Sequence, residues 1–194
     1  MKIFSSLAFI VIALIFNTSA KAQLKIPVTS NELRTNLERI ISGFPSHLAG
    51  LVGDTIVENP QTIEFESLLD FKMASENSIT QYKSTKPIYS WKAIMLNSEE
   101  FEDAAKKYKW LYNQLKVMTI WIDSYSFTMS GDYDEPDESR KFCSSIFKLT
   151  PNASNIPKLK VEVAMNFEFP EWKVSLVVYE KEREDNERGE IYGE

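Results

Sequence analysis

Three short motifs occur twice in this 194-residue chain, in the same order and about 80 residues apart. Each motif and its counterpart share glycine, aromatic or serine positions: Gly53-Asp54 with Gly131-Asp132, Phe65-Glu66-Ser67 with Phe142-Cys143-Ser144, and Trp91-Lys92-Ala93 with Trp172-Lys173-Val174. Each block follows an amphipathic helical pattern. A unit of one helix and three or four strands cannot bury its sheet face alone, whereas two adjacent units can share a sheet. The chain is therefore expected to be α+β, with two tandem helix-plus-antiparallel-meander repeats, about 29–96 and 97–180. We expect one sheet, with both helices packed on one face.

Two stretches have the periodicity of amphipathic helices. The first spans 30–43, begins with a capping box formed by Thr29 and Glu32, and ends at Gly43 and Pro45. The second begins with Asn97 as its cap and Glu100 three residues later. Apolar residues then cover one of its faces: Phe101, Ala104, Ala105, Tyr108, Leu111, Tyr112, Leu115 and Met118.

Alternating apolar and polar residues predict strands in the remaining segments. The expected strands are 51–58, 63–71, 78–84 and 88–96 in the first repeat, and 124–131, 141–149, 158–168 and 172–180 in the second. This arrangement is similar to that of tandem helix-plus-four-strand proteins such as the exported β-lactamase inhibitor proteins. A resemblance of arrangement carries no function with it.

The N-terminus has the three regions of a secretory signal peptide. Lys2 supplies the positive charge, residues 3–16 are almost wholly apolar, and Ala20-Lys21-Ala22 forms a small-x-small cleavage site. The apolar run is too short for a bilayer, which takes roughly 20 residues. We therefore expect residues 1–22 to be removed and the product to be periplasmic or extracellular, without an integral membrane span. The mature chain would comprise one domain over 23–181 and a charged, mobile tail over 182–194.

The composition excludes some classes of partner. The formal net charge is −6, and nucleic acids and anionic lipids are bound through an excess of lysine and arginine. No nucleic-acid partner is therefore expected. The single cysteine cannot form an internal disulfide, so the fold must be held by its core.

The sequence offers no catalytic constellation. His47, the only histidine, follows Phe44-Pro45-Ser46 at the end of the first helix, carries no flanking catalytic signature, and is interpreted as a surface or capping residue. Cys143 is interpreted as a small, partly buried strand residue. One histidine and one cysteine cannot form a zinc cluster, and no glycine-rich phosphate loop is present. No cofactor is expected.

The segment after Gly131 is dense in carboxylates. Asp132, Asp134 and Asp137 are candidate calcium ligands, because oxygen-rich loops bind that ion. The position that should be glycine in an EF-hand loop is Asp137, so we interpret the segment as a solvated hairpin loop.

Trp110 lies opposite Phe101 on the second helix, on its polar face and near Val117. A water-facing tryptophan is characteristic of interaction surfaces, which makes Trp110 and Val117 candidate partner-binding residues. The leading hypothesis is a non-enzymatic binding or protein-interaction module that contacts a protein partner or a second copy of the chain. The alternatives are a carboxylate-dependent hydrolase of an envelope polymer and a carrier of an apolar small ligand.

Overall fold

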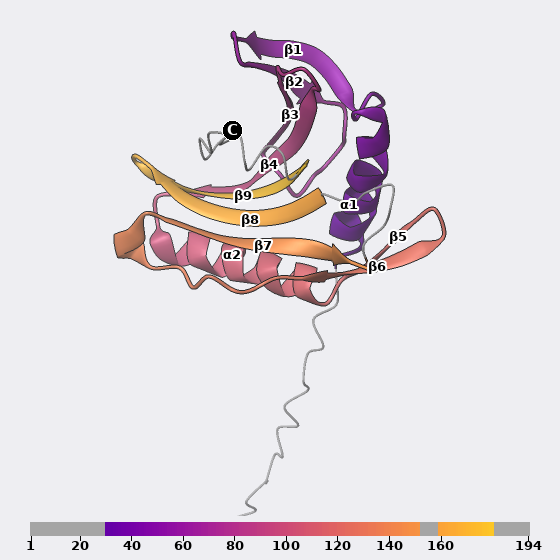
Figure 1. Cartoon of the computed structure of the whole chain (residues 1–194). Helices are drawn as coiled ribbons and strands as arrows, with labels where there is room; N and C mark the ends of the chain where they lie inside the picture. The colour runs from indigo at the N-terminus through magenta and orange to yellow at the C-terminus, as the bar shows by residue number, and fades with distance from the viewer. Residues whose placement is uncertain (1–29, 152–158, 181–194) are drawn as a thin grey trace, which may run out of the picture.

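The computed structural model describes residues 30–151 and 159–180. The expected signal peptide, the whole of the expected charged tail and the capping residue Thr29 lie outside these residues. The described chain forms one nine-stranded antiparallel sheet and two α-helices, which is an α+β fold (Figure 1). The order of the strands is β1-β2-β3-β4-β9-β8-β7-β6-β5, so the last strand of the chain lies in the middle of the sheet.

The first half of the chain supplies one helix and four strands. Its elements are α1 (Asn31–Gly43), the 3₁₀ turn η1 (Phe44–Ser46), β1 (Val52–Glu58), β2 (Thr62–Ser67), β3 (Glu76–Tyr82) and β4 (Ile88–Ser98). The side chain of Ser30 caps α1 by accepting a hydrogen bond from the Leu33 amide. Strand β2 ends at Ser67, so Leu69 and Phe71 are buried beyond the strand instead of continuing its alternation.

The second half supplies one helix and five strands. Its elements are α2 (Phe101–Lys116), β5 (Thr119–Ile122), β6 (Tyr125–Ser130), the 3₁₀ turn η2 (Glu138–Arg140), β7 (Phe142–Thr150), β8 (Leu159–Glu168) and β9 (Glu171–Glu180). The predicted cap at Asn97 is wrong, because β4 continues through Ser98, where Asn97 and Ser98 pair with Lys173 and Trp172 of β9. Glu100 instead precedes the helix and makes no side-chain cap hydrogen bond.

The two helices contact different parts of the sheet. Helix α2 lies along β4, β8 and β9 and also contacts β6, whereas α1 contacts β5. Their buried residues and those of the sheet form one continuous apolar core. Its largest fully buried side chains include Trp91, Tyr108, Phe147, Leu37 and Met118. The indole of Trp91 donates to Ser67 Oγ over 3.1 Å, which satisfies the one polar atom of this side chain.

The sheet is strongly curved (Figure 1). Strands β1–β3 rise away from β8 and β9, which leaves an open space on the inner side of the curve. None of the helices in the described part of the chain is long and apolar enough to span a membrane.

Candidate functional site

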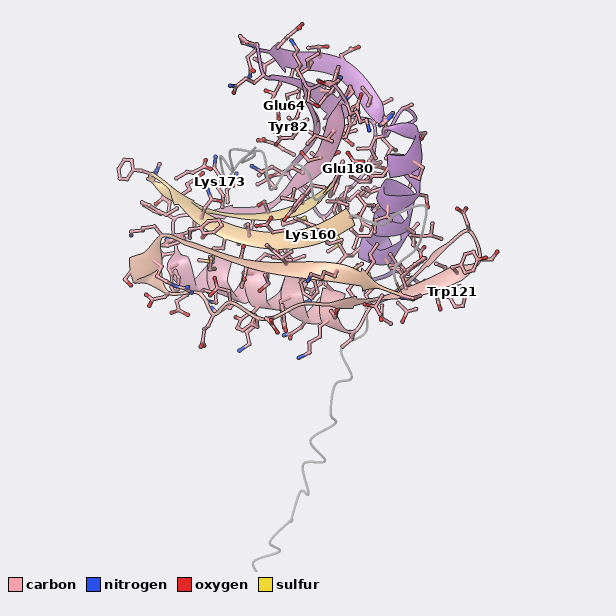
Figure 2. All side chains as sticks on the ribbon, in the orientation of Figure 1. Glu64, Tyr82, Trp121, Lys160, Lys173 and Glu180 are labelled. Atoms are coloured by element: carbon pink, nitrogen blue, oxygen red, sulfur yellow. The ribbon has the colours of Figure 1, made fainter. Side chains whose placement is uncertain are left out.

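A hollow of about 610 Å³ lies on this inner side of the sheet. Figure 2 shows Glu64 and Lys173 on opposite sides of the open space. The lining comes from β1 to β4, with Ser75 just before β3, and from the turn end of the β8–β9 hairpin. It comprises Ile56, Glu64, Glu66, Ser67, Ser75, Glu76, Asn77, Ser78, Lys92, Ile94, Glu168 and Lys173. We call this hollow the inner groove. It is open, polar and charged.

The pairing of the strands places the charged side chains of the inner groove in rows. Glu66 pairs with Ser78, and Ser78 pairs with Lys92 on the next strand. A carboxylate and an ammonium group are therefore separated by one strand that carries a hydroxyl. Adjacent strands are about 4.8 Å apart, so the backbone positions of Glu66 and Lys92 are about 10 Å apart. A small polar group of a ligand could lie between them.

One ion pair closes the far side of the inner groove. Lys173 Nζ lies 2.5 Å from Glu168 Oε2. The hydrogen bond from Lys173, followed by that from Asn166, lowers the pKa of Glu168, and the same carboxylate raises the pKa of Lys173. Both groups are thus held in their charged forms. A general acid needs the opposite shift, a raised carboxyl pKa, so Glu168 is poorly suited to protonate a leaving group.

Other charges in the inner groove have no such partner. Among the described residues, Glu64, Glu66 and Lys92 make no ion pair. Carboxylates outnumber ammonium groups, because Glu64, Glu66, Glu76 and Glu168 face only Lys92 and Lys173. The acidic excess lies on β2, on the side of the groove bounded by the edge strand β1.

The structure places Trp110 on α2 and Val117 directly after the end of that helix, both apart from the inner groove. Trp110 is half-buried and packs against the core, so it does not face water as the helical pattern predicts. One turn beyond Trp110, the Ser30 amide at the start of α1 donates to Gln114 Oε1 over 2.7 Å. Lys107 Nζ covers the indole at 4.9 Å from the ring centroid. Val117 is exposed.

The acidic loop forms internal hydrogen bonds. Asp134 accepts from Arg140 over 2.9 Å and from the Ser144 amide over 3.3 Å, and Asp137 accepts from the Ser139 amide over 2.8 Å. Asp132 does not join these contacts. The described residues contain no group of three or more His, Cys, Asp or Glu side chains that could hold a metal ion.

The single cysteine is buried beside a polar contact between helix and sheet. Tyr108 of α2 and Ser145 of β7 share a hydrogen bond of 2.7 Å, and Ser145 Oγ also accepts from the Asp134 amide over 3.1 Å. Burial raises the pKa of the Cys143 thiol to about 11, with a smaller contribution from Asp134. The thiol therefore stays protonated and poorly nucleophilic at neutral pH. His47 is exposed, and its ring lies 5.2 Å from that of Tyr89.

The sequence pattern predicted β6 as the strand 124–131 but missed β5, and with it the β5–β6 hairpin. Trp121 and Tyr125 of this hairpin are among the most exposed large apolar side chains. Trp121 and Tyr125 are 57% and 70% exposed, and Figure 2 shows Trp121 far from the inner groove. Positive φ angles at Asp123 and Ser124 form the two-residue turn between the strands. The signal available in the sequence was Asp-Ser between two short β-branched or aromatic runs.

The two edges of the sheet differ. The Trp121 amide on β5 donates to Glu38 Oε1 of α1 over 2.9 Å, so α1 covers that short edge. At the other edge, residues 54–58 of β1 are exposed and β1 pairs only with β2.

Comparison of the chain with protein-family models, curated proteins and solved structures finds no match. The likeness in arrangement to the exported β-lactamase inhibitor proteins therefore gains no support from these comparisons. Functional inference rests on the geometry of the described residues.

Proposed function

We propose that the chain is an exported, non-enzymatic binding protein whose inner groove binds a ligand or partner segment that carries positive charge. One observation carries this proposal. The groove holds two carboxylates on one strand, Glu64 and Glu66, that have no ion-pair partner among the described residues. Unpaired charges in an open hollow are available to a ligand without first breaking an internal contact.

The duplicated architecture belongs to the same proposal. We infer that residues 29–96 and 97–180 are related repeats, with β5 as an added strand. The order of the strands supports this, because β1-β2-β3-β4 and β6-β7-β8-β9 both run inward and meet at the junction of β4 and β9. Trp91 pairs with Val178, six residues after Trp172, and Trp172 pairs with Ser98, seven residues after Trp91. A bulge between Ile94 and Leu96 accounts for the extra residue.

The matched glycines support the same relation. A Cβ atom on Gly53 would meet the Glu66 carbonyl oxygen, and one on Gly131 would meet the Ile146 carbonyl oxygen, each on the neighbouring strand. Packing of both helices on one face, the other part of this inference, is supported by Figure 1, where α1 and α2 lie outside the curve of the sheet. The inner face is then left open for binding.

The two alternatives receive less support from the same groove. A carboxylate-dependent hydrolase needs an acid with a raised pKa opposite a second acid, whereas the pKa of Glu168 is lowered by Lys173. A carrier of an apolar ligand needs an enclosed apolar cavity. The inner groove is open, and its apolar lining residues are Ile56 and Ile94.

A charge-reversed pair of peptides tests the proposal. The isotopically labelled domain is titrated with a decapeptide of alternating lysine and serine, and with its glutamate-serine counterpart, by NMR. We expect the lysine peptide to shift the amide signals of residues that line the inner groove, and the glutamate peptide to have no such effect. The Glu64→Gln/Glu66→Gln double variant should weaken binding about threefold to tenfold, the range for two exposed charge pairs.

The matched control is Glu102→Gln on the first turn of α2, which removes one of the exposed carboxylates far from the groove. Equal weakening by Glu102→Gln, or signal shifts spread evenly over the surface, would show that the peptide responds only to net charge. Either result would reject the inner groove as the binding site.

A further inference from the structure

The exposed edge of β1 borders the inner groove. Ile56 of β1 is one of the groove-lining residues, and it is 55% exposed. Figure 1 shows β1 at the free end of the curved sheet, above the open space. The backbone hydrogen-bonding groups on the outer side of this strand have no partner strand among the described residues.

The edge of β1 lacks several of the features that usually prevent strand addition. Proteins protect edges with lysine, proline, short strands, β-bulges or covering elements, and of these β1 has only irregular pairing around Thr55. The sequence of β1, Val-Gly-Asp-Thr-Ile-Val-Glu, contains neither lysine nor proline, and its exposed part is rich in β-branched residues. The opposite edge, by contrast, is four residues long and covered by α1 through Glu38. Strand addition is therefore open at β1 and blocked at β5.

The charges along β1 determine which strand fits. Asp54 and Glu58 flank the exposed apolar pair Ile56 and Val57. In an antiparallel pair of two β1 strands centred on Ile56, Asp54 of each copy would lie opposite Glu58 of the other. Like charges directly opposite destabilise a strand pair. A second copy of the chain is thus disfavoured in the register that would bury the apolar pair.

A basic partner removes this repulsion. Lysine or arginine side chains on an added strand would face Asp54 at the edge and could extend to Glu64 and Glu66 on β2, about 10 Å away. Irregular pairing in β1, with register shifts before and after Thr55, bends the first part of the strand. The exposed stretch available to a partner, residues 54–58, spans the second of these shifts, and only Val57 and Glu58 pair with β2 in regular register.

We propose that β1 is a strand-addition site for an extended partner segment in which basic residues alternate with apolar ones. This inference rests on the proposed function, because it names the class of segment that the acidic side of the inner groove binds. Main-chain hydrogen bonds to β1 would give affinity, and the carboxylates of β1 and β2 would select basic side chains.

Amide hydrogen exchange of the labelled domain distinguishes strand addition from binding by side chains alone. The probe is an octapeptide of alternating lysine and valine, and the control is its glutamate-valine counterpart, which has the same strand propensity. At saturating lysine-valine peptide we expect exchange at alternate amides within residues 55–58 to slow at least tenfold, with no change for the control peptide. Glu64→Gln/Glu66→Gln should weaken the binding, and Glu102→Gln should not.

Three outcomes would overturn the inference. Binding that shifts groove signals without slowing exchange in β1 would reject strand addition and leave the groove proposal intact. Absence of binding at about 1 mM peptide would also reject strand addition, and the lysine-serine titration would then decide the groove proposal separately. Protection of β1 that rises with protein concentration, without peptide, would identify a second copy as the occupant.

Discussion

The hydrogen bond between Tyr108 and Ser145 should be one of the more sensitive polar contacts in the core. Both side chains are almost fully buried, and Ser145 Oγ also accepts from the Asp134 amide. Ser145→Ala removes both hydrogen bonds and leaves the Tyr108 hydroxyl and the Asp134 amide without a partner. We expect the free energy of unfolding to fall by about 2–3 kcal/mol, because buried groups left unsatisfied cost about 1–3 kcal/mol each.

Tyr108→Phe should cost less, about 1 kcal/mol, because Ser145 keeps its contact with Asp134. In the double variant the Tyr108 hydroxyl is no longer left unsatisfied, so its cost should be smaller than the sum of the two single costs by about 1 kcal/mol. Urea unfolding followed by tryptophan fluorescence measures all four proteins. Ser144→Ala on the same strand is the control, and we expect a change of less than about 0.5 kcal/mol.

Strict additivity of the two substitutions would refute this reasoning, because it would mean that the two hydroxyls do not interact. A cost below about 1 kcal/mol for Ser145→Ala would also refute it, since water would then be replacing the lost partners without penalty.

Three further predictions concern the thiol, a close backbone contact and the groove ion pair. Because burial raises the pKa of Cys143 to about 11, Ellman's reagent at pH 8 should label the folded protein at least about 100-fold more slowly than the urea-unfolded chain. Similar labelling rates for the folded and unfolded protein would contradict the burial of this thiol. Gly131→Ala should lower the midpoint of urea unfolding strongly, because the added Cβ would lie under 3.0 Å from the Ile146 carbonyl oxygen. The control Gly50→Ala should not, because nothing lies within 4 Å of the Cβ added there. Equal effects of the two substitutions would contradict the close approach at Gly131. The hydrogen bond with Lys173 lowers the pKa of Glu168, so Lys173→Met should raise this pKa toward its ordinary value in a carboxyl NMR titration, whereas the control Lys106→Met should leave it unchanged. Because the folded-state pKa of Glu168 is the lower one, the contribution of this ion pair to stability is present above the unfolded-state pKa and is lost as the pH falls through the folded-state pKa.

The periodicity of apolar residues was sufficient to predict the helices and strands that are long and amphipathic. The α1 boundaries and eight of the nine strands follow patterns visible in the sequence. Strand β5 did not, because its four residues immediately follow α2 and are too few to establish an alternation. Phe169 shows the limit of the same rule: it continues the alternation of β8, yet it is 89% exposed because the strand ends at Glu168.

The inner groove could not be located in the sequence. Its charged residues come from β2, β3, β4, β8 and β9, and only the pairing of β4 with β9 brings Glu66 and Glu168 to one hollow. The curvature of the sheet likewise depends on all of its strands together and cannot be predicted from one segment of the sequence. The helical pattern did identify Trp110, but a helical wheel of α2 alone cannot show that this side chain packs against the core or that Ser30 donates to Gln114.

The central position of β9 affects the order in which the chain can become structured. During synthesis β1–β4 emerge first, and β4 keeps a free edge until residues 171–180 have followed. A chain interrupted before that point would expose two incomplete half-sheets, each with an unpaired edge strand. Pairing of β9 with β4 and β8 therefore joins the two halves of the sheet, and until it occurs the unpaired edge of β4 is open to aggregation.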